Sequence, residues 1–195
     1  MLNYPLIIAV LLGAYLLGNI SPSTLIAKSK GINIKKAGSG NAGTTNALRV
    51  LGKKAALVTL IIDIGKGTAA VLIAKALLPW DIAMFSALLV FLGHVWPICL
   101  KFQGGKGVAT AFGALLGVNW KLALICLAIV IVIVLITRMV SLGSISAAVI
   151  FVILAYFMEP AFLKVGIPMA AILIFKHRAN LVRIIKGEEN KISFK

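Results

Sequence analysis

Residues 122–137 read LALICLAIVIVIVLIT, a run without a charged side chain that decides the class of fold. About 20 such residues cross a bilayer as a helix. Only 13% of all residues are charged, whereas soluble domains average about 25%. Further predominantly apolar segments cover residues 4–27, 55–78, 82–100, 108–118, 143–157 and 162–175. The sequence therefore predicts an all-α fold, a polytopic membrane helical bundle that forms a single integral membrane domain over residues 1–195.

The basic residues predict how this bundle is oriented. They are concentrated in residues 28–54, in residues 101–107 and in the tail from residue 176 onward. Positively charged loops accumulate on the cytoplasmic side of a membrane. If all three stretches lie there, the first segment starts outside and the number of spans is odd. We therefore expect about seven transmembrane helices, with the N-terminus outside and the C-terminus cytoplasmic. Five spans is the alternative, whereas six would place the basic tail outside.

The net charge of +15 suits nucleic acid, anionic lipid or an anionic substrate. Because the basic residues lie in short loops between apolar segments, we expect no nucleic-acid partner. Cys99 and Cys126 lie in apolar stretches without metal-ligand spacing, so we expect both to be small core residues. The sequence shows no cluster of His, Cys and Glu typical of a metal site, and we expect none.

The first polar segment predicts a loop that binds phosphate. Residues 38–46 read GSGNAGTTN, and Arg49 follows them. The three glycines permit positive φ and a close approach of the backbone to a ligand, and the loop N–H groups can form an anion-binding nest. Short hydroxyl and amide side chains add neutral donors, and Arg49 can grip a phosphate with two parallel hydrogen bonds. The alternative is a flexible polar connector.

A second polar segment follows the third apolar run. Residues 93–110 read GHVWPICLKFQGGKGVAT. The glycines bring backbone N–H groups near a ligand, Lys106 supplies a positive charge, and the N-terminus of the next helix favours an anion. A nucleotide-binding P-loop is not expected, because Gly107 stands where that pattern requires Ser or Thr. The alternative is that Lys106 only keeps this loop on the cytoplasmic side of the membrane, as positively charged loop residues commonly do.

Two further groups of polar residues stand out. His177, Asn180 and Arg183 recur every three residues after the last apolar segment, so they can share one helix face. Such a basic tail is also typical of a lipid-headgroup anchor. Asp63 and Lys66 share a face within the second apolar segment, where charges are costly and normally face the protein interior. This pair either locks helix packing or supports the site.

Taken together, the three polar segments closely resemble the bacterial membrane glycerol-3-phosphate acyltransferases that use acyl phosphate as the donor (the PlsY family). The first resembles the motif G-S-G-N-x-G-A-T-N with a following Arg, and the second matches G-H-x-x-P-x-x-x-x-F-x-G-G-K-G-x-A-T throughout. The third resembles H-R-x-N followed by G-x-E-x-K. The resemblance covers essentially the whole chain. Thr44 departs from the usual Ala, and Asn33 and Lys35 stand where Asp and Arg are common.

The resemblance implies a reaction and a set of site residues. An acyl chain moves from acyl phosphate to the 1-hydroxyl of glycerol 3-phosphate, giving lysophosphatidic acid and phosphate in the first step of phospholipid synthesis. It implies no cofactor, and it places the enzyme in the bacterial inner membrane with the active site facing the cytoplasm. We expect a monomer in contact with membrane lipid. The catalytic residues, which we assign to glycerol 3-phosphate, are Ser39, Arg49, Lys106, His177 and Asn180. The remaining substrate-binding residues are Gly38, Gly40, Asn41, Gly43, Thr44, Thr45, Asn46, His94, Gly104, Gly105, Gly107, Thr110, Arg178 and Glu189.

Within this set, the backbone N–H groups of residues 40–43 and 104–107 are expected to hold the donor phosphate. The general base stays open, because a substrate phosphate oxygen, His177 and His94 are all candidates. Functions of other classes also stay open at this point. A phosphate-ester transporter would share the basic loops but would be expected to show inverted repeats, and a lipid-anchoring scaffold would not need the glycine spacing.

Overall fold

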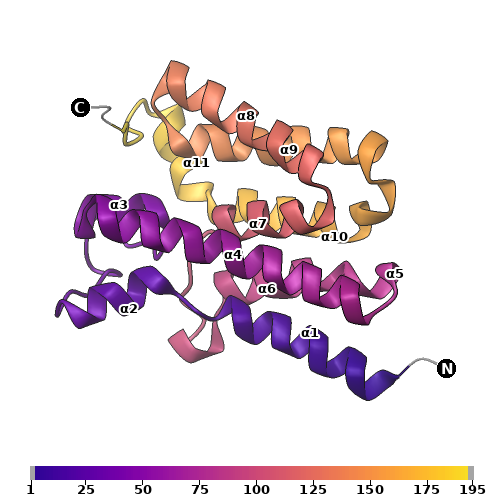
Figure 1. The fold of residues 1–195 in the computed structure, drawn as a ribbon. Coiled ribbons are helices and arrows are strands. Elements are labelled where there is room, and N and C mark those ends of the chain that lie inside the picture. Colours follow the sequence, from indigo (N-terminus) through magenta and orange to yellow (C-terminus); the bar gives the residue numbers. More distant parts are fainter. Residues whose placement is uncertain (1–2, 193–195) are drawn as a thin grey trace. The chain divides into compact units, whose positions relative to one another are not determined.

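The computed structural model describes residues 3–192, and over that range the regular elements are all helices (Figure 1). The chain divides into two compact units, an N-terminal unit of Met1–Val118 and a C-terminal unit of Asn119–Lys195. The all-α prediction is confirmed. Each unit is described by itself below.

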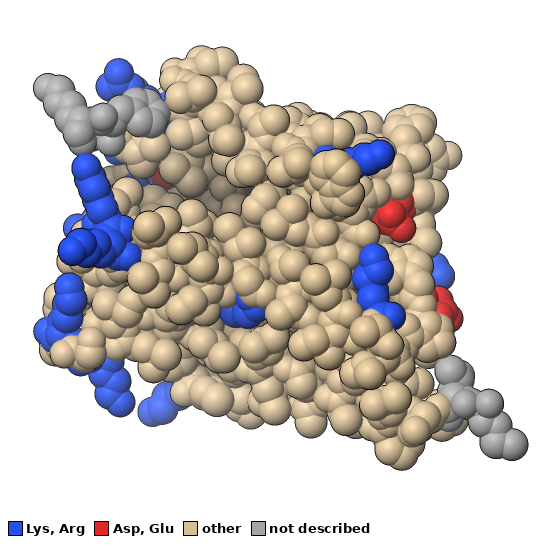
Figure 2. Space-filling view, viewed as in Figure 1, with Lys and Arg blue, Asp and Glu red and all other residues tan. Residues whose placement is uncertain are grey.

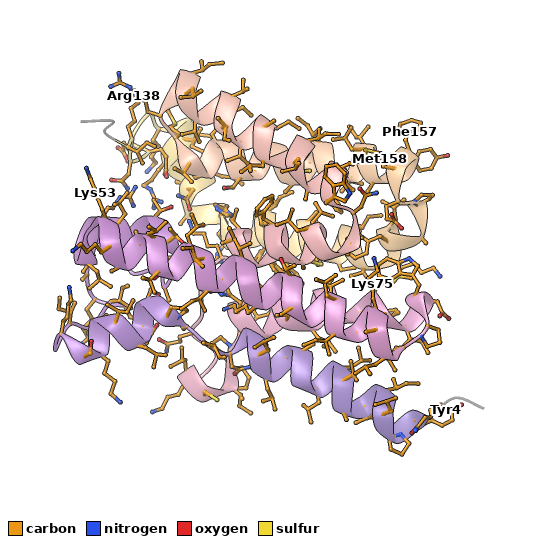
Figure 3. All side chains as sticks on the ribbon, in the orientation of Figure 1. Tyr4, Lys53, Lys75, Arg138, Phe157 and Met158 are labelled. Atoms are coloured by element: carbon orange, nitrogen blue, oxygen red, sulfur yellow. The ribbon has the colours of Figure 1, made fainter. Side chains whose placement is uncertain are left out.

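The N-terminal unit is built around one long helix, α4, which packs against α1, α6 and α7. Figure 3 shows Lys53, at the start of α4, at the opposite end of this unit from Lys75 and from Tyr4, the first residue of α1. Its elements are α1 (Tyr4–Gly18), α2 (Pro22–Ser29), α3 (Thr44–Leu51), α4 (Lys53–Leu77), α5 (Trp80–Ala83), α6 (Phe85–Val95), the 3₁₀ helix η1 (Ile98–Leu100) and α7 (Val108–Val118).

The C-terminal unit contains two long antiparallel helices and a bent pair. Arg138 adopts a left-handed conformation with φ 61° and ends the first long helix, and Figure 3 places it at the opposite end of these helices from Phe157 and Met158. The elements are α8 (Trp120–Thr137), α9 (Val140–Met158), the 3₁₀ helix η2 (Pro160–Phe162), α10 (Leu163–Lys176) and α11 (Arg178–Ile185).

The helices support a multi-pass membrane protein. Four of them, at Lys53–Leu77, Trp80–Leu100, Trp120–Thr137 and Val140–Met158, are long and apolar enough to cross a membrane. Two bent pairs, α1 with α2 at 43° and η2–α10 with α11 at 55°, raise the number to six if each is one span. The apolar helix α7 has 11 residues. A count of seven, with α7 as the additional span, stays a prediction.

The first apolar segment, predicted over residues 4–27, forms two helices with a break between them. The first helix ends at Gly18 and the second begins at Pro22. Proline lacks an N–H and disfavours helical geometry at the residue before it, which explains the break. The prediction for the cysteines was half right, because Cys126 is buried but Cys99, in η1, is exposed.

Small residues set the helix contacts that flank the second polar segment. A Cβ atom built on Gly93 of α6 would overlap the carbonyl oxygen of Tyr15 in α1, and one on Gly67 of α4 would overlap that of Thr110 in α7. Close backbone approach at small residues is the usual way in which membrane helices pack. The Thr68 hydroxyl adds a hydrogen bond to the Gly113 carbonyl of α7 at 2.8 Å. Residues 96–107 are therefore held at both ends by tightly packed helices.

Candidate active site

The first glycine loop is organised around one buried side chain, that of Asn46 in α3. Its Oδ1 accepts a hydrogen bond from the Ser39 N–H at 2.8 Å. Its Nδ2 donates to the carbonyls of Ala37 at 3.1 Å and Ile34 at 3.4 Å. Asn46 therefore shapes the loop from within, and a direct contact of its side chain with substrate stays a prediction.

Glycine is required in this loop for two reasons. Gly38 and Gly40 have φ values of 59° and 69°, in the left-handed region that other residues rarely adopt. A Cβ on Gly38 would also overlap Oδ1 of Asn46. The Gly40 N–H donates to the Ala37 carbonyl at 3.1 Å. This bond corrects the expectation that the Gly40 amide is one of the donors to a phosphate.

The end of the loop leads into α3. The Ser23 hydroxyl in α2 donates to the Ala42 carbonyl at 2.8 Å and anchors the loop there. Helix α3 then begins at Thr44, and first-turn N–H groups have no partner inside their own helix. The Thr44 hydroxyl oxygen is buried without a hydrogen-bond partner among the residues that the structure describes. The N–H groups of Thr44 and Thr45 and the Thr44 hydroxyl are therefore candidate donors at this end of the loop.

The second glycine loop folds back on the end of α6. The Gly104 N–H donates to the Val95 carbonyl at 3.3 Å, and the Gly105 N–H donates to the His94 carbonyl at 3.1 Å. These bonds correct the expectation that both amides bind the donor phosphate. At Gly107, φ is 82° and a Cβ would overlap the ring of Phe91. Thr110 lies in the first turn of α7, and its hydroxyl oxygen is buried without a partner among the described residues.

One hydrogen bond joins the two glycine loops. The Lys35 ammonium donates to the Gly104 carbonyl at 2.7 Å, across 69 residues of sequence. Ser39 and Arg49 are exposed on the first loop and α3, and Lys106 is half-buried on the second loop. Figure 2 shows Lys and Arg side chains gathered at the end of the N-terminal unit that carries α2, α3 and the start of α4. The two loops thus form one basic region.

A buried polar cluster lies beneath the second loop. Lys66 and Asp63 form an ion pair at 2.7 Å on α4, as their three-residue spacing predicts. The His94 Nδ1 atom is 2.9 Å from the Lys66 ammonium and 3.3 Å from the Asp63 carboxylate. A Cβ on Gly105 would overlap Nε2 of the same ring. His94 is therefore packed into the protein on both ring nitrogens. This position disfavours His94 as a general base, and its predicted contact with substrate stays a prediction.

The third motif lies at the bend between α10 and α11 in the C-terminal unit. His177 is buried at this bend, with Nδ1 2.8 Å from the Leu173 carbonyl. Because a carbonyl can only accept, Nδ1 carries the hydrogen, and the neutral ring then has its lone pair on Nε2. Arg178 is exposed and lies over the Phe175 ring at 4.6 Å. His177 is thus oriented as a base or hydrogen-bond acceptor through Nε2.

Glu189 holds the third motif together. Its carboxylate accepts hydrogen bonds from Asn180 at 2.6 Å and from Ser141 of α9 at 2.9 Å. It also pairs with Arg183 at 2.8 Å. Burial alone would raise the pKa of Glu189, but these hydrogen bonds and the charge of Arg183 lower the pKa below its ordinary value. The carboxylate therefore organises the tail around α11, and a contact of Glu189 with substrate stays a prediction.

Comparison with known proteins shows to which family the chain belongs. The family model described as glycerol-3-phosphate acyltransferase matches residues 8–187. This chain belongs to that family. A glycerol-3-phosphate acyltransferase of Clostridioides difficile (strain 630) is 46% identical over 200 residues, covering 97% of this chain and 96% of the relative. One of Mesorhizobium japonicum is 43% identical over 196 residues and covers 100% of both chains.

Two solved structures are similar to this chain over nearly its whole length. Both are of PlsY (YgiH), described as an integral membrane glycerol 3-phosphate acyltransferase, and both are 35% identical to it. The glycerol 3-phosphate form has a TM-score of 0.91 and covers 96% of each chain. The lysophosphatidic acid form has a TM-score of 0.88 and covers 96% of this chain and 95% of that one. The protein is therefore an integral membrane acyltransferase of phospholipid synthesis.

Within this family member, each unit brings together part of the predicted site. The N-terminal unit places the loops of Ser39 and Lys106 side by side through Lys35. The C-terminal unit places His177 and Asn180 at one bend, where Asn180 bonds to Glu189. The sequence interpretation gave no role to Lys35, because Arg is common there in the family. Lys and Arg both carry a positive charge, and this shared property was the signal that could have identified Lys35.

Proposed function

We propose that this protein transfers an acyl chain from acyl phosphate to the 1-hydroxyl of glycerol 3-phosphate. The products are 1-acylglycerol 3-phosphate (lysophosphatidic acid) and inorganic phosphate. The observation that carries the proposal is the joined pair of glycine loops with Arg49 and Lys106, in a chain similar to a PlsY solved in a glycerol 3-phosphate form. Both proposed substrates bear a phosphate, which accounts for two basic, glycine-rich loops.

In this proposal the acceptor's phosphate binds Ser39, Arg49 and Lys106. His177 and Asn180 of the third motif are also assigned to the acceptor. The donor's phosphate binds the amides around Asn41–Thr45 and at Lys106–Gly107, while the acyl tail lies among the apolar helices. Arg49 supplies two parallel donors to a phosphate, and Lys106 supplies a compact charge. Holding both reactants in line supplies much of the rate, since well-aligned reactants gain about 7–11 kcal/mol.

The chemistry needs one proton transfer. The acceptor hydroxyl oxygen attacks the acyl carbonyl carbon, and the bond from that carbon to the bridging oxygen breaks. The phosphate leaves with the electron pair, and a substrate phosphate oxygen takes the hydroxyl proton. His177 is the competing base, because its neutral tautomer has a lone pair on Nε2. The enzyme is further proposed to be a monomer in the bacterial inner membrane, with seven spans, an outside N-terminus and the site facing the cytoplasm.

The decisive experiment is a phosphate-release assay on the purified protein. We expect release of inorganic phosphate and formation of 1-acylglycerol 3-phosphate, identified by mass spectrometry, when acyl phosphate and glycerol 3-phosphate are both present. Acyl-coenzyme A in place of acyl phosphate is expected to give no product. Phosphate release without the acceptor would indicate a hydrolase, and product formed from acyl-coenzyme A would contradict the proposed donor.

Sidedness is tested by cysteine labelling from either side of the membrane. Single cysteines at position 106 and at position 178, the exposed neighbour of the buried His177, are expected to react with an impermeant maleimide from the cytoplasmic side in a chain without Cys99 and Cys126. Labelling of the two positions from opposite sides would exclude a common site. Uncoupled uptake of glycerol 3-phosphate into vesicles, without acyl transfer, would instead support a transporter.

A further inference from the structure

Lys66 makes more contacts than an ion pair requires. Its ammonium donates to the Gly18 carbonyl at 3.1 Å and to the Ile20 carbonyl at 2.6 Å. These carbonyls lie where α1 ends, and the last carbonyls of a helix have no partner inside that helix. A buried carbonyl left without a partner is unfavourable. Lys66 of α4 therefore supplies a hydrogen-bond donor to the carbonyl groups at the break between α1 and α2.

The positive charge of Lys66 is neutralised by a carboxylate on the same helix. Asp63, one helical turn away, lies 2.7 Å from the ammonium, and His94 Nδ1 lies at 2.9 Å. The three residues are 1% to 5% exposed. A charge buried this deeply is stable when it is paired and hydrogen-bonded, and unstable when one partner is removed. Asp63, Lys66 and His94 thus form one set, which we call the Lys66 cluster.

The Lys66 cluster reaches the second glycine loop through His94. The His94 carbonyl accepts a hydrogen bond from the Gly105 N–H at 3.1 Å. The other side of the same ring, at Nε2, lies so close to Gly105 that a Cβ there would overlap it. The next residue in the chain is Lys106. The orientation of the His94 ring therefore sets where Gly105 lies on the end of α6, and Gly105 in turn sets the starting position of Lys106.

Two helix interfaces beside the Lys66 cluster are formed at glycines. The contact of α4 with α7 is formed at Gly67 and Gly113, and the contact of α1 with α6 at Gly18 and Gly93, through close backbone approach. The polar contacts of Lys66 are made to a helix break and to His94. The cluster therefore connects α4 with the α1–α2 break and with His94, which lies at the start of the second polar segment.

We propose that Lys66 is a positioning residue for acyl transfer. Together with Asp63 and His94 it connects the α1–α2 break to the loop at Gly104–Gly105, and so holds Lys106 in place. The part that concerns turnover rests on the proposed function. The part that concerns the loop does not, and it can be measured without substrate.

Three variants and a control test the proposal. K66M removes the ammonium and keeps the stem, D63N removes the countercharge, and the double variant K66M/D63N removes both charges. K75M is the matched control, because Lys75 lies on the same helix and also donates to a carbonyl, that of Gly117 in α7 at 3.2 Å. Hydrogen–deuterium exchange over residues 101–107, thermal stability and steady-state kinetics are measured for each variant in detergent.

K66M is expected to exchange at Gly104 and Gly105 about tenfold faster than the parent, with α7 and α8 unchanged. Its kcat/KM is expected to fall about 100-fold, the loss that a misplacement of about 1 Å produces. The double variant is expected to regain the thermal stability that either single change loses. It should not regain loop protection or turnover, because the contacts to the α1–α2 break and to His94 are still missing. K75M should resemble the parent in loop exchange and in kcat/KM.

The double variant separates positioning from charge balance. Recovery of kcat/KM to within about threefold of the parent in K66M/D63N would overturn the proposal, as would acceleration of exchange throughout α1, α4 and α7 in place of residues 101–107. If K66M does not accumulate in the membrane, the double variant carries the test alone. If the parent itself does not turn over acyl phosphate, the proposed function fails, and the exchange measurement still decides the position of the loop.

Discussion

The contact between Gly105 and His94 makes Gly105→Ala a quantitative test of how the second glycine loop is built. A Cβ at this position would lie 3.1 Å and 3.2 Å from two ring carbons of His94 and would overlap Nε2. Carbon atoms in good contact are about 3.5–4.0 Å apart. Either the ring or the loop must therefore move. The ring is held by Lys66 and Asp63 on its other side, so we expect the loop to move.

The cost follows from known effects of overpacking. Inserting an extra methyl group into a well-packed site costs about 1–3 kcal/mol. A factor of ten in rate corresponds to about 1.4 kcal/mol. If the displaced loop carries Lys106 away from the reacting groups, kcat/KM for acyl transfer is expected to fall about 5- to 150-fold. Thermal stability should fall as well, because the same strain is present without substrate.

The assay is steady-state release of phosphate with both substrates, beside thermal unfolding in detergent. Gly65→Ala is the matched control, since Gly65 lies in α4 and an added Cβ would meet nothing within 4 Å. Alanine is the better helix former, so this variant should be as stable as the parent or more stable. Combining Gly105→Ala with His94→Ala removes the ring that is overlapped. The loss in the double variant should then be smaller than the sum of the two single losses. A Gly105→Ala variant within about twofold of the parent, or strictly additive losses, would refute the packing argument.

Three further predictions follow from the contacts of single residues. Lys35→Met removes the hydrogen bond to Gly104 and is expected to lower kcat/KM about tenfold, whereas Lys35→Arg can still donate and should retain most of the activity. Lys36→Met is the control, because Lys36 is exposed. Equal losses of kcat/KM in the Lys35→Met and Lys36→Met variants would indicate a general charge effect. Because the pKa of Glu189 is lowered in the folded protein, its stabilising contribution is present above the ordinary glutamate pKa and is lost as pH falls through the lower folded value. Thermal unfolding from pH 7 to pH 3 should therefore show a smaller drop in melting temperature for Glu189→Gln, and equal drops would contradict the assignment. If a substrate phosphate is the base, His177→Asn should keep the shape of the pH profile of kcat with a loss below about 100-fold, whereas loss of a histidine base costs about 10²–10⁴-fold and removes its titration.

How far the sequence predicted the site can be judged from Asn46, Lys35 and Glu189. The motifs identified two glycine loops and a histidine bend, because glycine spacing and clustered donors are local properties of the chain. They did not show that Asn46 and Glu189 bond to their own loop and tail. An amide or carboxylate has the same hydrogen-bonding groups whether it faces a ligand or the backbone, so the choice depends on what folds around it. The 69-residue bond of Lys35 was likewise outside any motif.

By itself, the sequence determined that this protein is an all-helical membrane protein of its family. In a bilayer there is no water to hydrogen-bond the backbone, so long apolar runs must form helices, whatever the arrangement of those helices in space. The tertiary structure decided where those helices break and which loops meet. The α1–α2 break depends on Pro22 and also on a lysine 46 residues away from Ile20 that bonds to its carbonyl. Contacts between residues so far apart in the chain arise when helices pack, and no local pattern of residue types contains them.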